Sequence, residues 1–247
     1  MTFRHATVVR LCILTLLSAS LASSSLLADG LIHKLPEDGT RVTYKTEFKS
    51  TPAPPPGFKA TVTLSSVGKV MHEGKACRWM ELAFITEFNE SKRAQYFKLL
   101  IPEDQLKKGG DPLTKMVKSY EQHGNGETKK TTREATADPV KGPLPLLFGG
   151  PLENVKPLEK TTLKTGLGDL ECTGNSGTYS KKKDDATFTA NIQSLAHENV
   201  PFGVAQLAIE FNLKEGEREQ KGSLTLTVEK VSTGVTSELP DSKQWRS

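Results

Sequence analysis

The stretch ACRWMELAFITEF, from Ala76 to Phe88, decides the fold class of this chain. Successive side chains of an extended strand point to opposite faces, and here both faces are largely apolar. One face holds Met80, Leu82, Phe84 and Phe88, and the other holds Cys77, Trp79, Ala83 and Ile85. Such a strand lies in the middle of a sheet with material packed on each side, or it lines a cavity with one face. The stretch therefore predicts a β-sheet core built around it.

The sequence on either side of this stretch keeps the two-residue period of β-strands. Arg41–Phe48 alternates apolar and polar side chains, and the alternation resumes at Phe58–Ser65 after the proline-rich connection Thr51–Gly57. A turn at Gly74 leads into the central stretch, and Ala94–Ile101 is its expected hairpin partner. These segments predict consecutive antiparallel strands.

The same period returns in the second half of the chain. The segments are Leu158–Lys164, Leu170–Tyr179, Ala186–Leu195, Val204–Leu213 and Ser223–Val231. We predict a mainly β fold of the α+β type, a strongly curved antiparallel sheet or half-barrel of about nine or ten strands with one packed helix.

The predicted helix begins at Asp111, a suitable N-cap residue, and Pro112 fits the first helical position. The apolar residues that follow form one stripe at helical spacing: Leu113, Met116, Val117 and Tyr120. Gly124 and Gly126 end this pattern, and the helix should lie across the sheet. Further along, Gly142–Pro151 is apolar and rich in glycine and proline, so we expect an irregular loop there.

The first residues of the chain have the order of a secretory leader. Arg4 and Arg10 give a positive start, and the short apolar run Leu11–Leu17 is followed by small residues. Cleavage after Ala22 or after Ala28 leaves a small residue at the cut in either case. The apolar run is too short to span a bilayer, so we expect it to be removed.

The predicted organisation is a cleaved signal peptide at residues 1–28 and a single β-rich domain at residues 29–247, exported to the periplasm or the cell exterior. No later run approaches eighteen consecutive apolar residues, so we expect no transmembrane segment in the mature chain. The chain has 33 basic and 29 acidic residues, and the basic run Lys181–Lys183 is followed at once by Asp184 and Asp185. We therefore expect no nucleic-acid partner, because such partners are recruited by regions of one charge sign.

Two cysteines remain after the predicted cleavage, Cys77 and Cys172, because Cys12 lies in the leader. An even number of cysteines in an oxidising compartment favours a disulfide between them. The alternative is a pair of buried free thiols on separate strands, and the sequence leaves both open.

Motifs that carry catalytic chemistry are hard to find in this sequence. The histidines after the leader, His33, His72, His123 and His197, have no recognisable catalytic setting. Gly174–Gly177 is one residue short of a nucleophile elbow, and Gly166–Asp169 lacks the third glycine of a dinucleotide loop. Cysteine and histidine spacings typical of metal sites do not occur. We therefore expect a protein without catalytic residues, metal or cofactor.

Two apolar loop segments, Leu146–Phe148 and Val200–Val204, suggest a binding role. They would either cover the mouth of a cavity and contact a ligand or partner, or plug the ends of the core. On the first reading, the candidate ligand-binding residues are Trp79, Phe84, Leu147, Phe148 and Phe202.

The layout from 41 to 231, with long amphipathic strands, a crossing helix, a proline-rich apolar loop and further strands behind a leader, resembles the LolA and LolB type of periplasmic lipoprotein carrier. The resemblance implies an incomplete β-barrel closed by helices over an apolar cavity that takes acyl chains. It is one of layout without a matched residue motif, so it assigns no binding residue, and only one helix is expected here. The stretch around Pro201–Gly203 is also similar to uncharacterised secreted bacterial proteins.

Our leading hypothesis is therefore an exported, non-catalytic protein that binds an apolar or lipidic ligand in the concave face of its sheet. The alternative is an envelope interaction or scaffold module with a filled core, which binds another envelope protein. A third hypothesis is a hydrolase of cell-envelope material.

Overall fold

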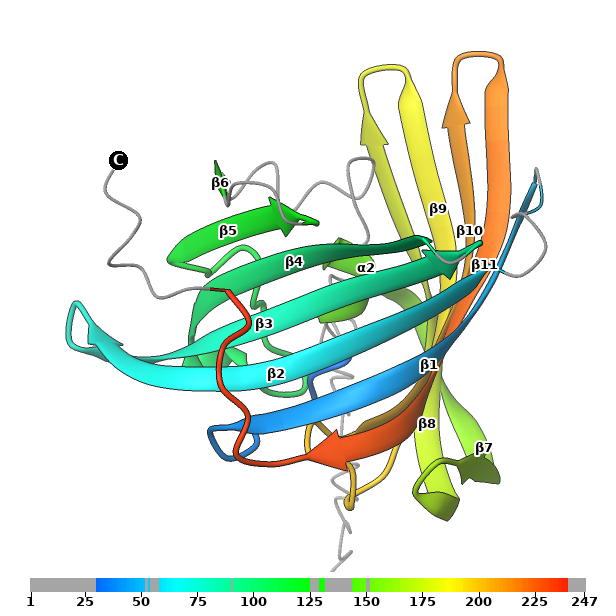
Figure 1. Ribbon diagram of the computed structural model, residues 1–247. Coiled ribbons are helices and arrows are strands. Elements are labelled where there is room, and N and C mark those ends of the chain that lie inside the picture. The colour runs from blue at the N-terminus through cyan, green and yellow to red at the C-terminus, as the bar shows by residue number, and fades with distance from the viewer. Residues whose placement is uncertain are drawn as a thin grey trace, which may run out of the picture.

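The computed structural model describes residues 30–51, 53, 58–89, 91–124, 129–131, 144–149 and 152–239. The predicted signal peptide and most of the Thr51–Gly57 connection lie outside the described residues. Eleven strands are described (Figure 1): β1 (Thr40–Thr51), β2 (Lys59–His72), β3 (Lys75–Phe88), β4 (Ser91–Pro102), β5 (Lys118–His123), β6 (Lys129–Lys130), β7 (Glu153–Thr165), β8 (Gly168–Lys183), β9 (Ala186–Ala196), β10 (Val204–Glu215) and β11 (Arg218–Ser232).

All eleven strands belong to one antiparallel sheet in the order β6-β5-β4-β3-β2-β1-β11-β10-β9-β8-β7. The prediction of a mainly β, antiparallel fold is confirmed, and the stretch Ala76–Phe88 forms an interior strand as expected. The first and last long strands pair along their length, from Arg41 opposite Ser232 to Thr51 opposite Lys221. This pairing joins the two halves of the chain into a single sheet.

The sheet is twisted and open, and it is neither the strongly curved sheet nor the half-barrel that the sequence predicts. In Figure 1 the long strands β1–β4 run across the view, while the hairpins of β8–β11 rise steeply from them. Right-handed strand twist accumulates over eleven strands and turns the two halves of the sheet against each other. The predicted strand number, nine or ten, is slightly low because the residues of β5 were assigned to the predicted helix.

The prediction of a helix that begins at Asp111 and ends before Gly124 is wrong. Asp111 does begin a turn, since its backbone carbonyl accepts the Lys115 N–H at 3.2 Å, but that turn does not continue. The Val117 N–H donates to the Leu100 carbonyl, and the next residues form β5 on the edge of β4. Leu113 and Met116 are buried in the core all the same. The apolar spacing therefore indicated correctly that these two residues are buried. The backbone that follows them pairs with β4 instead of forming a helix.

The described helices are a 3-10 turn at Glu103–Gln105 (η1) and one short helix, α2 (Leu144–Phe148). The irregular loop expected at Gly142–Pro151 is thus replaced in part by α2, whose five residues are all buried. The Leu31 N–H donates to the Leu147 carbonyl at 2.6 Å. A Cβ on Gly30 would come within 2.4 Å of the Phe148 carbonyl carbon, so this close contact requires glycine.

One face of the sheet, which we call the inner face, carries the core. It includes Val42 and Tyr44 of β1, Leu64 of β2, Leu82 of β3 and Leu99 of β4. This face is covered by four non-strand segments, which contribute Leu31, Leu106, Met116, Leu147 and Phe202 to the same cluster. The middle of the inner face is therefore filled with side chains. The opposite face of the sheet is called the outer face below.

Cys77 and Cys172 are both buried and are not bonded to each other. They lie on β3 and β8, which are separated by five strands in the sheet order. Burial raises the pKa of both thiols, and the carboxylates of Asp104 and Glu103 raise that of Cys77 further. Of the two alternatives, the structure has the pair of buried free thiols rather than the disulfide.

Candidate functional site: a groove at the open end of the inner face

Three of the five candidate ligand-binding residues lie inside the core. Leu147 and Phe202 have no exposed surface, and Phe148 is 3% exposed. The Phe202 carbonyl accepts the His33 N–H at 2.8 Å, which ties its loop to the first described segment. In this structure the two apolar segments plug the core, as the second reading of the sequence had it.

The two remaining candidates, Trp79 and Phe84, point to opposite faces of β3. Trp79 lies on the outer face, where its ring centroid is 5.9 Å from that of Tyr120 and 5.5 Å from the Lys98 Nζ. Phe84 lies on the inner face and meets Phe97 edge to face, with ring centroids 6.3 Å apart. The structure therefore does not bring the five candidates together, and only Phe84 stands at an opening of the inner face.

Phe84 lines a groove of about 500 Å³ at the end of β3, β4 and β5. The register places Phe84 opposite Gln95, and Gln95 opposite His123, so these three side chains form one row on the inner face. Thr86 and Arg93 are paired in the next inner-face row and also line the groove. The groove therefore has a half-buried aromatic floor and a polar wall.

The polar wall is held together by one carboxylate. Glu121 Oε1 accepts a hydrogen bond from Gln95 Nε2 at 2.7 Å and lies 2.7 Å from His123 Nε2. The Glu121 side chain is 25% exposed, whereas that of His123 is 69% exposed. The Glu121 carboxylate thus already interacts with the side chains of Gln95 and His123. His123, which has no recognisable catalytic setting in the sequence, is the last residue of β5.

The rim of this groove is basic. Lys92 and Arg93 both line it, and both are exposed. Lys92 lies 3.9 Å from Glu87, a distance at which an exposed ion pair contributes little. Within the described part of the chain, no hydrogen bond or ion pair is recorded for the Arg93 side chain. A groove that is lined by the Phe84 ring and by two exposed cationic groups, Lys92 and Arg93, suits a ligand with an apolar body and an anionic end.

The groove lacks the parts of a nucleophilic or metal site. Its lining includes one hydroxyl group, Thr86, and no cysteine or serine. The His123–Glu121 contact orients the imidazole but gives it no nucleophile to activate. Across the described ranges, no group of three or more histidine, cysteine, aspartate or glutamate residues could hold a metal ion. Among those same residues, no helix is long and apolar enough to cross a membrane.

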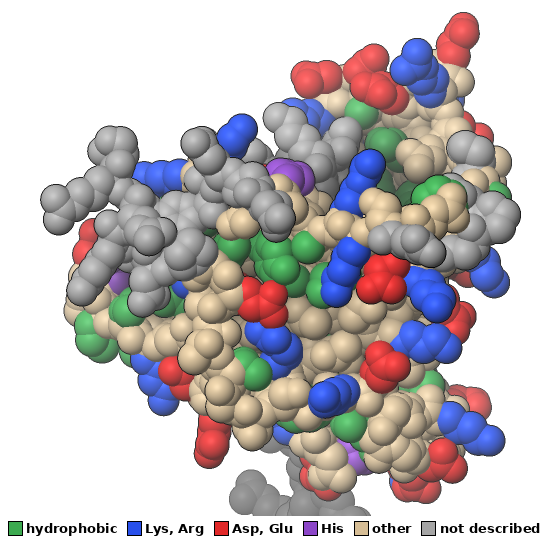
Figure 2. All heavy atoms as spheres, in the orientation of Figure 1, with side chains coloured by type: hydrophobic (Ala, Val, Ile, Leu, Met, Phe, Trp, Pro, Cys, Tyr) green, Lys and Arg blue, Asp and Glu red, His purple; other side chains and the backbone are tan. Residues whose placement is uncertain are grey.

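A second groove, of about 610 Å³, is lined by residues of β1 and β8–β11. Two rows of polar side chains from these five strands line it: Lys49, Ser223, Glu210, Asn191 and Thr178, then Thr51, Lys221, Asn212, Thr189 and Ser180. The row between them also contributes to the lining, and it includes the aromatic residues Tyr179 and Phe211. In Figure 2, basic and acidic side chains are interspersed over the face in view. The sequence shows which residues of each strand are polar, but it does not show the register that places these residues side by side.

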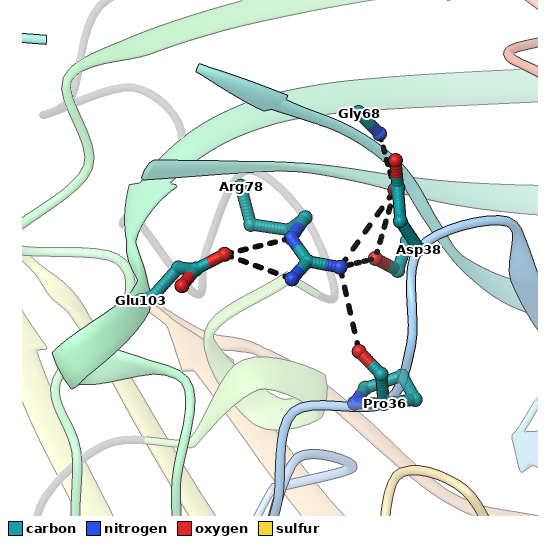
Figure 3. A network of polar contacts seen from close by, with 6 residues as sticks. Pro36, Asp38, Gly68, Arg78 and Glu103 are labelled. Atoms are coloured by element: carbon teal, nitrogen blue, oxygen red, sulfur yellow. Dashed lines mark hydrogen bonds and ion pairs between the residues drawn. The ribbon is translucent and has the colours of Figure 1, made fainter. Parts of the chain in front are cut away.

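A buried arginine, which sequence reasoning missed, anchors the first described segment to the sheet (Figure 3). The Arg78 side chain is 4% exposed, and its Nη1 donates to Ser66 Oγ at 2.7 Å and to the Pro36 carbonyl at 3.4 Å. Asp38 Oδ1 lies 3.7 Å from Nη1 and accepts the Gly68 N–H at 2.7 Å. Because every contact of this network is internal to the protein, we assign it a structural role.

The chain matches no family model and no curated protein. The solved structures that the chain resembles include the following two. One is a candidate lipoprotein from Parabacteroides distasonis, with a TM-score of 0.34 and 8% identity over 83% of this chain and 100% of that one. The other is a candidate exported protein with a YmcC-like fold from Bacteroides fragilis, with a TM-score of 0.35 and 7% identity over 82% of this chain and 99% of that one. Likeness at this level assigns no residue and no activity.

Proposed function

We propose that this protein is an exported, non-catalytic binding protein that holds an anionic amphiphile in the groove of Phe84, Arg93 and His123. The export half of the proposal is supported by the order of charged, apolar and small residues in 1–28. The binding half is supported by one observation above all: the half-buried Phe84 and the exposed Arg93 line one groove of about 500 Å³.

The size and lining of the groove fit a ligand with one apolar chain. Pockets that hold small molecules are about 300 to 1,000 Å³ and combine apolar walls with a few polar groups. Each methylene group that the ligand buries against Phe84 contributes about 0.8 kcal/mol. A terminal carboxylate or phosphate would reach Lys92 and Arg93 at the rim.

The filled middle of the inner face supports the alternative function, an envelope interaction module with a filled core. Leu147 and Phe202 occupy the centre of that face, so the ligand is confined to the open end of β3–β5. The two proposals differ in one measurable respect. An amphiphile-binding protein binds the isolated ligand saturably, whereas an interaction module binds a protein partner only.

Titration of the full chain, purified from the envelope fraction of an expressing host, tests the proposal. The ligands are dodecanoate and, as a neutral amphiphile of equal chain length, dodecyl maltoside. We expect saturable binding of dodecanoate, seen by native mass spectrometry and calorimetry, and weaker binding of the maltoside. The substitution Arg93→Gln should weaken dodecanoate binding about tenfold, since a hydrogen bond to a charged group contributes about 1.5 to 3 kcal/mol.

The matched control is Lys45→Gln, which removes a charge from an outer-face side chain that is 68% exposed. It should leave the dodecanoate affinity unchanged. Absence of saturable dodecanoate binding, or an equal loss in both variants, contradicts the proposal.

A further inference from the structure

The last described segment of the chain crosses the outer face of the sheet. It leaves β11 at Ser232, turns at Gly234, whose φ is 68°, and passes over β1, β2 and β3 (Figure 1). The Val235 N–H donates to the Gly39 carbonyl at 3.0 Å. We call residues 233–239 the C-terminal strap. It adds no strand to the sheet, so side-chain groups must hold its far end.

One buried carboxylate binds the backbone of this strap. Glu81 on β3 is 4% exposed. Its Oε2 accepts the Glu238 N–H at 2.9 Å, and its Oε1 accepts the Leu239 N–H at 3.2 Å and the Ser237 hydroxyl. Two successive backbone N–H groups therefore converge on a single carboxylate, which is an arrangement that recognises peptide backbone rather than a particular side chain.

A buried cation completes the site from the neighbouring strand. Lys98 on β4 is paired in register with Glu81, and its Nζ lies 3.8 Å from Glu81 Oε1. The same ammonium group donates to Ser237 Oγ at 2.6 Å and to the Leu239 carbonyl at 3.4 Å. The pair thus offers acceptors for the N–H groups of a peptide and a donor for its carbonyl oxygen.

The side chains of the strap also have separate places on the sheet. Leu239 is 1% exposed. The Glu238 carboxylate lies 2.7 Å from Arg41 Nη1 on β1 and is hydrogen-bonded to the side chain of Tyr96 on β4. A hydroxyl residue, an acidic residue and a leucine are therefore each recognised in turn. By contrast, Thr233, Gly234 and Thr236, which connect this triplet to β11, are exposed.

We propose that the outer face of β1–β4 carries a peptide-binding site for an extended Ser-Glu-Leu segment, which the C-terminal strap of the same chain occupies. Release of the strap opens the site to the same segment of a second copy, so that two chains exchange their C-terminal segments. The site lies on the opposite face of the sheet from the groove of Phe84, and its test does not depend on the function proposed for that groove.

The experiment cuts the strap after folding. A protease recognition sequence is inserted between Thr233 and Gly234 of the full chain, and the folded protein is cleaved and freed of the fragment by gel filtration. A fluorescent peptide with the sequence of residues 235–247, VTSELPDSKQWRS, is then titrated into cut and uncut protein. We expect the cut protein to bind the peptide at least about tenfold more tightly, because the attached strap competes at a high effective concentration.

Three controls test whether the peptide binds where the strap lies. A peptide in which Leu239 is replaced by Asp should lose measurable binding, since an aspartate would be buried where the leucine packs. The cut Glu81→Gln variant should bind the original peptide at least about tenfold more weakly, and circular dichroism shows whether it is folded. The cut Lys45→Gln variant should bind like the unsubstituted cut protein.

Each other outcome overturns the proposal. If the cut protein unfolds, the strap is a structural part of the fold and not the occupant of a site. If the fragment stays bound through gel filtration and does not exchange with labelled peptide, the strap is not releasable. If the cut protein freed of its fragment is folded but does not bind the peptide, or binds the aspartate peptide as tightly as the original peptide, this recognition does not exist.

Discussion

Arg78 donates two hydrogen bonds to a single oxygen of Glu103, from Nε at 3.0 Å and from Nη2 at 2.8 Å. The two residues come from β3 and from the 3-10 turn η1, so this contact fixes where the chain goes after β4. The Arg78 side chain is 4% exposed, and that of Glu103 is 29% exposed. A charge this deep in the protein depends on its partners, because water cannot replace them.

Removal of this partner should therefore be strongly destabilising. In Glu103→Gln, the guanidinium stays buried, and among the described residues the one anion left within ion-pair distance is Asp38, at 3.7 Å. Loss of one partner of a buried pair typically costs about 3 to 5 kcal/mol. We expect a loss of about 3 kcal/mol in the free energy of unfolding, measured by urea titration. The control Glu87→Gln, whose side chain is 54% exposed, should change it by less than about 0.5 kcal/mol. Equal effects of both substitutions would show that the Arg78 contact is not formed.

The two buried thiols should react slowly and should not be linked. Burial raises the pKa of Cys77 and Cys172, so the reactive thiolate is scarce in the folded protein. At pH 8 we expect iodoacetamide to label both residues at least about tenfold more slowly in the native protein than in urea, without added reductant. Peptide mass spectrometry measures each site separately. A peptide pair joined through the two sulfur atoms would restore the disulfide prediction.

The pKa of Tyr96 should report whether the C-terminal strap is in place. Burial raises this pKa first, and the nearby Glu238 carboxylate raises it further by its charge and hydrogen bond. Because the folded-state pKa is raised, the stabilisation is complete below the ordinary tyrosine pKa of about 10 and is lost as the pH rises through the folded-state value. Glu238→Gln should lower the pKa of Tyr96, seen as the phenolate absorbance that disappears in Tyr96→Phe.

The control for this titration is Tyr44. Its hydroxyl is buried and donates to the Val204 carbonyl at 3.2 Å, and burial raises its pKa strongly. It should ionise only when the protein unfolds, in the unsubstituted protein and in Glu238→Gln alike. An unchanged titration of Tyr96 in Glu238→Gln would mean that the strap does not reach β4 in solution.

The two-residue period of the sequence predicted nearly every long strand, because burial on one face of a strand is a local property. Met80, Leu82 and Phe84 do share the inner face, and Trp79 does face the other way. The stripe around Leu113 and Met116 misled the helix prediction, since residues buried in a turn over the sheet have the same spacing as a helical face.

The candidate site depended on information that no local pattern contains. Phe84 was a candidate from the sequence and lines the groove, but its neighbours Gln95 and His123 are set by the register of β3, β4 and β5. Leu147 and Phe202 were named for their apolar loops, and those loops fold into the core. Sequence analysis missed the peptide site proposed on the outer face, because in the sequence Glu81 and Lys98 are indistinguishable from the solvent-facing polar residues of ordinary strands. A segment more than a hundred residues away covers them.

The pairing of Glu81 with Lys98 leads to a last prediction, on coupling between the two residues. Both side chains are at most 8% exposed, and each also bonds the C-terminal strap. Glu81→Gln leaves a buried ammonium group without its anion, and Lys98→Met leaves a buried carboxylate without its cation, so each should cost about 3 kcal/mol or more of unfolding free energy. The double variant removes both charges at once and should cost clearly less than the sum, with a coupling energy of about 1 to 3 kcal/mol in urea unfolding. Strictly additive losses would mean that the two charges do not interact, and the strap would then be held by hydrogen bonds alone.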